Sequence, residues 1–216
     1  MHAKNKLVNT IHYNGKKKNP IGKFCLCAFN SESERIPFTF NYGHSFVVIQ
    51  NDSDKDIYIN DFCLKAHQRC SIGGWGQRHH IGLWYNLELY YFMLNRYLGR
   101  ACLITEIEED DIPKLAEFIR THDHWSTKYN CCSTTAIGMY NSVCNKEDII
   151  EEGKNLIPGK LYDKICMRDA HLFDQSLEGE FSKPGYFSED GYEEYDFDWK
   201  HKERYMVKWT HYKLSC

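Results

Sequence analysis

Two short segments of the sequence carry residue types that can perform nucleophilic chemistry. One holds His44 within residues 42–49, at the expected start of a strand, and the other holds Cys131 and Cys132 at the expected start of a helix. A helix N-terminus offers unpaired N–H groups and the positive end of the helix dipole, which stabilise a thiolate. A histidine from a neighbouring strand can take the thiol proton, and a third polar group can orient that histidine. The two segments therefore predict a thiol nucleophile that attacks a carbonyl, with helix N–H groups stabilising the oxyanion.

Helical phase distinguishes the two adjacent cysteines. At about 100° per residue, Cys131 and Cys132 point in different directions from the helix axis. Only Cys132 shares the stripe that is expected to face the sheet, which consists of Ala136, Met139 and Val143. Cys132 is therefore predicted as the nucleophile. A buried structural cysteine would occupy the same stripe, so periodicity alone leaves that alternative open.

The third catalytic residue is predicted from the register of an expected hairpin. A turn centred between Ser53 and Asp54 places His44 opposite the region near Cys63. Asn60 is a polar residue close to that region, so Asn60 is predicted to orient the imidazole. If the third strand lies closer to His44, the alternatives are Ser71, Gln77 and His79.

The rest of the sequence predicts short strands with helices between them. Strands are expected at 23–29, 43–50, 57–64 and 101–107, with 71–77 as a strand edge or a loop. Helices are expected at 86–98, 110–120, 131–144 and 160–166, with Asn86 and Asn130 as N-caps. A last strand is expected near 205–212. This order of elements indicates an α+β fold with an antiparallel sheet packed against the cysteine-bearing helix.

Composition and charge exclude several classes of protein. The 216 residues include 27 Lys plus Arg and 30 Asp plus Glu, so the net charge of -3 gives no reason to expect nucleic-acid binding. The sequence has no apolar stretch of about 18–20 residues, so no membrane span is expected. The polar N-terminus shows no secretory signal, which predicts a cytoplasmic protein with reduced thiols unless a non-classical route exports it. The oligomeric state stays open.

The ten cysteines and eleven histidines give no pattern that is typical of a metal site. Cys25 and Cys27 are separated by one intervening residue and share a face of the expected strand, but no second pair has a matching spacing. Residues 79–80 and 122–124 contain paired histidines without the further ligands of a zinc hydrolase. The sequence therefore predicts no metal and no cofactor.

Three short motifs follow one another along the chain. They are residues 43–46 (Gly-His-Ser-Phe), residues 132–136 (Cys-Ser-Thr-Thr-Ala) with Tyr140-Asn141, and residues 158–162 (Pro-Gly-Lys-Leu-Tyr). Through them, residues 40–165 resemble the NlpC-like branch of papain-fold cysteine peptidases in its circularly permuted arrangement, where the histidine strand precedes the cysteine helix. Lecithin:retinol acyltransferase-like proteins share that order. The doubled cysteine departs from the family pattern, because alignment to a plain Asn-Cys start makes Cys131 the nucleophile. Cys132 is preferred for the Ser-Thr that follows it.

The resemblance implies a permuted papain-like fold and a thiol hydrolase that cleaves a peptide or isopeptide bond, with peptidoglycan stem peptides common as family substrates. In this hypothesis Cys132 attacks, His44 acts as base and then as acid, and Asn60 orients the imidazole. The alternatives are an acyltransferase of the same fold and a non-catalytic binding module. The expected organisation is an N-terminal extension (1–22), a catalytic domain (23–170) and an acidic-aromatic C-terminal extension that packs on the domain (171–216).

Overall fold

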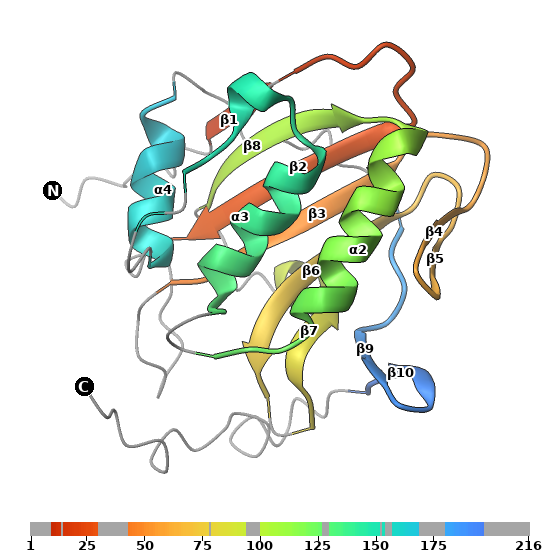
Figure 1. Ribbon diagram of the computed structural model, residues 1–216. Coiled ribbons are helices and arrows are strands. Elements are labelled where there is room, and N and C mark those ends of the chain that lie inside the picture. The colour runs from red at the N-terminus through yellow and green to blue at the C-terminus, as the bar shows by residue number, and fades with distance from the viewer. Residues whose placement is uncertain are drawn as a thin grey trace, which may run out of the picture.

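The structure is a computed structural model that describes residues 10–13, 15–29, 43–77, 79–93, 100–126, 130–151, 153, 157–168 and 180–196. This part of the chain has a mixed α+β fold, with one large sheet and a few helices (Figure 1). The strands are β1 (Thr10–Tyr13), β2 (Gly22–Phe29), β3 (Ser45–Asn51), β4 (Ile57–Ile59), β5 (Phe62–Leu64), β6 (Arg69–Gly76), β7 (Ile81–Tyr85), β8 (Arg100–Ile107), β9 (Gly185–Ser188) and β10 (Gly191–Glu194). The helices are α1 (Leu87–Met93), α2 (Ile112–His122), α3 (Cys132–Val143) and α4 (Pro158–Cys166), with single 3-10 turns at η1 (Glu109–Asp111) and η2 (Lys146–Asp148).

The large sheet has the strand order β1-β8-β2-β3-β6-β7-β9-β10. Its neighbouring strands are antiparallel except for β1, which runs parallel to β8. The strand that follows His44 is β3, which lies between β2 and β6 and is buried along its whole length. Backbone ladders on both edges of β3 therefore fix the position of the residue that precedes it.

Side chains of β3 alternate between two apolar clusters on the two faces of the sheet. Val47 and Ile49 belong to the main core with α2, α3 and α4, which lie in front of the sheet in Figure 1. Phe46 and Val48 belong to a second, smaller cluster that includes Leu89 of α1. Burial of each of these side chains contributes about 1.5–3 kcal/mol. The two clusters therefore fix where α3 begins on one face and where α1 begins on the other.

The expected pairing of residues 43–50 with residues 57–64 is wrong. β3 pairs with β2 and β6, whereas residues 57–64 fold back on themselves as the separate β4-β5 hairpin. Asn60 lies in the turn of this hairpin with φ at 52°, in the left-handed region that asparagine tolerates better than most residues. The β3-β6 register pairs Val47 with Ile72, and its continuation brings Trp75 rather than Asn60 beside His44.

Both edges of the large sheet come from segments that were predicted as extensions. Residues 10–13 form β1 beside β8. β9 and β10 continue the sheet from β7, and their Phe187 and Tyr192 contact the main core. The helix expected at 86–98 is described as α1 over 87–93. Residues 94–98 and the strand expected near 205–212 lie outside the described residues.

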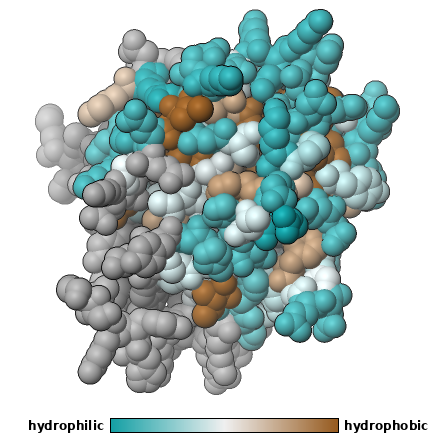
Figure 2. All heavy atoms as spheres, in the orientation of Figure 1, coloured by the Kyte–Doolittle hydropathy of each residue, from teal (hydrophilic) through white to brown (hydrophobic). Residues whose placement is uncertain are grey.

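The face that carries α2, α3 and α4 is mostly hydrophilic over its described part, with scattered hydrophobic residues (Figure 2). Among the helices of the described ranges, none combines the length and the apolar character that crossing a membrane requires.

Gly138 lets α3 approach α2 closely, because a Cβ at this position would lie 2.2 Å from the ring of Phe118. We expect Gly138→Ala to lower the thermal unfolding temperature. The overpacking costs about 1–3 kcal/mol, which exceeds the gain of about 1 kcal/mol that alanine has over glycine inside a helix. In a Phe118→Ala background the same substitution should stabilise the protein, since the clash is gone. Circular dichroism melts of the four proteins measure both effects, and a wild-type chain stabilised by Gly138→Ala would contradict this account.

Candidate active site

Cys132 is the first residue of α3, within the helix that the sequence predicts. The residue before it, Cys131, is the N-cap with an extended backbone, and the Cys131 side chain makes no capping hydrogen bond. Asn130, which was expected as the cap, instead donates from Nδ2 to the carbonyl oxygens of His122 and His124. The side chain of Asn130 therefore holds the loop before α3, and no cap side chain competes with an anion for the first-turn N–H groups.

His44 reaches Cys132 from the start of β3. The hydroxyls of Ser45 and Ser133 are 3.1 Å apart, which ties the residue after His44 to the residue after Cys132. Nε2 of His44 lies 2.9 Å from Oε1 of Glu88. The Cys132 thiol is the second hydrogen-bond partner of this imidazole.

The surroundings of this pair favour its charged form. Burial alone would raise the pKa of Cys132, but the hydrogen bond and charge of His44, with the Ser45 N–H group, lower it below its ordinary value. Burial also opposes protonation of His44, yet its hydrogen bonds to Cys132 and Glu88 raise the pKa of the imidazole to about 10. The arrangement therefore supports a thiolate-imidazolium pair near neutral pH.

Glu88 of α1 is the residue that orients His44, and sequence reasoning missed it. Its side chain is 0% exposed. Besides the contact with His44, Oε1 accepts a 2.7 Å hydrogen bond from Nε1 of Trp75, and Oε2 accepts a 2.8 Å hydrogen bond from the Ser71 hydroxyl. The only sequence signal was an acid between two leucines, Leu87 and Leu89. In the first turn of a helix such an acid is expected for ordinary reasons of helix stability.

Two glycines of β6 make room for the site. A Cβ on Gly73 would lie 2.0 Å from Oε1 of Glu88 and 3.2 Å from Nε2 of His44. A Cβ on Gly74 would lie 3.2 Å from the ring of Trp125. Gly73 must therefore lack a side chain, because any side chain there would occupy the place of the Glu88 carboxylate.

The structure brings His44 and Cys132 together, and it corrects the third residue. Asn60 is exposed in the β4-β5 turn, and its Nδ2 donates a 3.0 Å hydrogen bond to the carbonyl of Ala116. Among the alternatives, Ser71 contributes through Glu88. No hydrogen bond from Gln77 or His79 to the imidazole is seen among the described residues. Gln77 is buried, and His79 lies beside the ring of Tyr195.

Trp75 completes the wall around the imidazole. Its ring centroid lies 4.1 Å from that of His44, and its indole N–H is bonded to Glu88. In the structure it restricts the imidazole from the side, so that His44 is held between an aromatic ring and a carboxylate.

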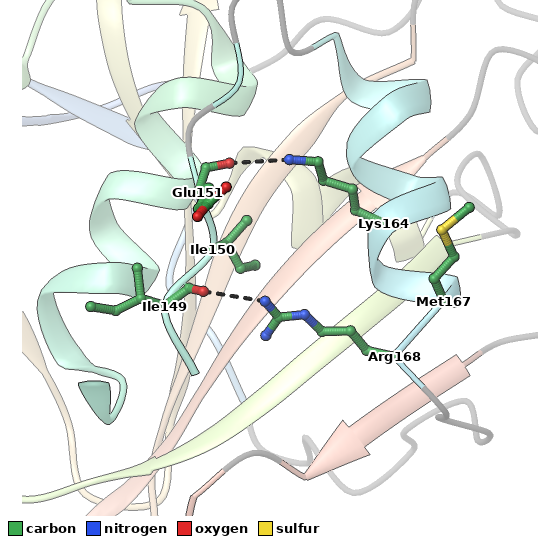
Figure 3. Close-up of a pocket in the computed structure, with 6 residues that line it drawn as sticks. All are labelled: Ile149, Ile150, Glu151, Lys164, Met167 and Arg168. Carbon is green, nitrogen blue, oxygen red and sulfur yellow. Dashed lines mark hydrogen bonds between the residues drawn. The ribbon is translucent and has the colours of Figure 1, made fainter. Parts of the chain in front are cut away.

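The pocket drawn in Figure 3 is separate from these residues. Lys164 donates to the carbonyl of Glu151, and Arg168 donates to the carbonyls of Asp148 and Ile149. Backbone oxygens therefore engage both cations, and the described residues that line the pocket include no histidine or cysteine.

Substitution of Glu88 tests its role in the site. We expect Glu88→Gln to lower the pKa of His44 and to raise that of Cys132, because the carboxylate charge that stabilises the imidazolium is lost. Alkylation of Cys132 by iodoacetamide at pH 7 should slow by about tenfold. Peptide mapping by mass spectrometry measures this rate for each cysteine.

Asn60→Ala is the matched control, because Asn60 was the sequence-based candidate for the same role. Its alkylation rate at Cys132 should equal that of the wild type. A slower reaction in Asn60→Ala, together with an unchanged one in Glu88→Gln, would reverse the assignment.

A scan against protein-family models and searches of curated proteins and of solved structures found no match to the chain. The functional hypothesis therefore rests on the motif residues and on the geometry of Cys132, His44 and Glu88.

Proposed function

We propose that the protein is a thiol hydrolase that cleaves an amide bond through a covalent acyl-enzyme. The observation that carries this proposal is the connected line from the thiol of Cys132 through the imidazole of His44 to the buried carboxylate of Glu88. A nucleophile, a base and a group that orients the base are the three parts that such chemistry requires.

In the first half of the proposed reaction, the Cys132 thiolate attacks the substrate carbonyl and forms a C–S bond. N–H groups at the start of α3 stabilise the oxyanion. The C–N bond then breaks as imidazolium His44 donates its proton to the leaving amine. In the second half, neutral His44 takes a proton from water, the resulting hydroxide breaks the thioester, and the acid product leaves with Cys132 again a thiolate.

We further propose that the fold is the permuted papain-like type. Its support is the order of elements, since the strand that follows His44 precedes the helix that starts at Cys132. The helix packs on the sheet through Ala136 and Met139. The antiparallel pairing of β3 with both of its neighbours is in keeping with this arrangement.

The proposed substrates are peptide or isopeptide amides. Trp125 lies against Gly74 and Gly76 close to Cys132, and so supplies an apolar wall next to the nucleophile. An aromatic wall beside the thiol favours a substrate whose acyl group is apolar over one whose acyl group carries a charge.

The ion pair predicts the pH dependence of the thiol. Because the pKa of Cys132 is lowered and that of His44 is raised to about 10, the reactive thiolate should persist at pH values where an ordinary cysteine is protonated. Alkylation of Cys132 should therefore persist to a lower pH than alkylation of an ordinary cysteine, and should decline only below the lowered pKa. In His44→Ala the decline should begin at a higher pH, because burial then raises the pKa of the thiol with no imidazolium to offset it. Identical profiles for the two proteins would contradict the ion pair.

Replacement of each adjacent cysteine tests the nucleophile. Cys132→Ala should abolish turnover of a panel of peptide and isopeptide substrates, whereas Cys131→Ala should retain it within about threefold. Intact-mass spectrometry after a brief reaction should show the acyl group on Cys132. His44→Ala should reduce turnover by about 10²–10⁴.

The opposite result for the two cysteines would transfer the role to Cys131. An acyl-enzyme that reacts only with an added amine, and not with water, would favour the acyltransferase alternative. An intact thiol with no acyl adduct on any substrate in the panel would favour a binding module.

A further inference from the structure

Three cysteine thiols converge on the face of the sheet that is opposite to α3. Cys25 and Cys27 lie two positions apart on β2, so their side chains share one face of the sheet. Cys102 of β8 is the cross-strand partner of Cys27. The sulfur of Cys27 lies 3.5 Å from that of Cys25 and 3.4 Å from that of Cys102, and all three sulfurs lie within 4.8 Å of one another. The sequence showed two of these thiols, and the β2-β8 pairing supplies the third.

Apolar side chains surround the three thiols. Cys25, Cys27 and Cys102 are 0%, 1% and 3% exposed. They share the second cluster with Phe46, Val48, Leu89 and Ile104, and partly buried Trp75 and Phe181 pack against it. Such a site excludes water as a ligand, so a metal ion bound there would depend on the sulfur atoms.

The spacing of the sulfurs suits three-coordinate binding. Metal–thiolate bonds are about 2.3 Å long, so three sulfurs placed around one ion in a plane lie about 4.0 Å apart. The distances of 3.4 and 3.5 Å, with the third within 4.8 Å, require only small side-chain shifts to reach this geometry. The strand ladder fixes the backbone on which the thiols are carried, so the ligand set is largely preformed.

The number and kind of ligands select the ion. Within the described residues, no fourth Cys, His, Asp or Glu joins the cluster. Structural zinc sites take four ligands, whereas soft thiolates are preferred ligands of Cu(I), which does not require a fourth.

We infer that Cys25, Cys27 and Cys102 form a buried three-thiolate site for Cu(I). Binding displaces the three thiol protons to solvent and forms three Cu–S bonds, with no change in the oxidation state of copper or sulfur. The site lies apart from Cys132 and does not depend on the proposed hydrolase activity.

The test uses the reduced full-length protein under anaerobic conditions. Cu(I) is supplied as its acetonitrile complex in competition with the chromophoric chelator bicinchoninate. We expect one equivalent to bind, and X-ray absorption of the wild-type complex should show three sulfur ligands at about 2.3 Å. Copper coordinated by nitrogen or oxygen atoms, or no copper retained against the chelator, would overturn the proposal without any variant.

Variants then locate the ion. Cys25→Ala, Cys27→Ala and Cys102→Ala should each weaken binding by at least about a hundredfold, since a ligand is removed. Cys70→Ala removes an equally buried thiol from β6 and should bind as the wild type does. Cys132→Ala should also bind normally, which separates this site from the nucleophile. Unchanged affinity in Cys102→Ala, with a native circular dichroism spectrum, would contradict the site.

Discussion

The buried carboxylate of Glu88 is the constraint on which the candidate site depends. Burying a carboxylate away from water costs free energy unless hydrogen-bond donors surround it. Loss of one donor would leave the carboxylate buried with its charge only partly compensated. Here the donors come from Ser71 and Trp75 of β6 and from His44 before β3. The register of two strands and the position of α1 must therefore be correct together, and Gly73 must lack a side chain for the carboxylate to fit.

His44 contacts side chains that come from opposite faces of the sheet. Glu88 belongs to α1, which packs on the second cluster through Leu89. Cys132 belongs to α3, which packs on the main core. Because His44 precedes the first residue of β3, its ring lies at the end of the sheet and can contact both groups. A histidine within the strand would be confined to one face by the alternation of side chains.

The closeness of His44 to Cys132 could be predicted from the sequence, because each residue lies in a local motif at the start of an element. The role of Glu88 could not be predicted in this way, since the partners that define its role are 13 to 44 residues away in the chain. The prediction of Asn60 assumes that residues 57–64 form one strand that pairs with residues 43–50. Residues 57–64 instead fold into the separate β4-β5 hairpin. The large antiparallel sheet and the helix at Cys132 follow from local patterns, whereas the parallel pairing of β1 with β8 required the three-dimensional structure.

The thiols of this protein differ because their neighbours differ. Cys132 has an imidazole that can hold its proton and a carboxylate that keeps the imidazole in place, so its thiolate is available to attack carbon. Cys27 has two other sulfurs at contact distance and apolar side chains around them. There a proton can leave readily only if a cation takes its place, because burial raises the pKa of Cys25 and of Cys27. In the two roles that we propose, the same residue type serves covalent catalysis on one face of the sheet and the binding of a soft metal ion on the other.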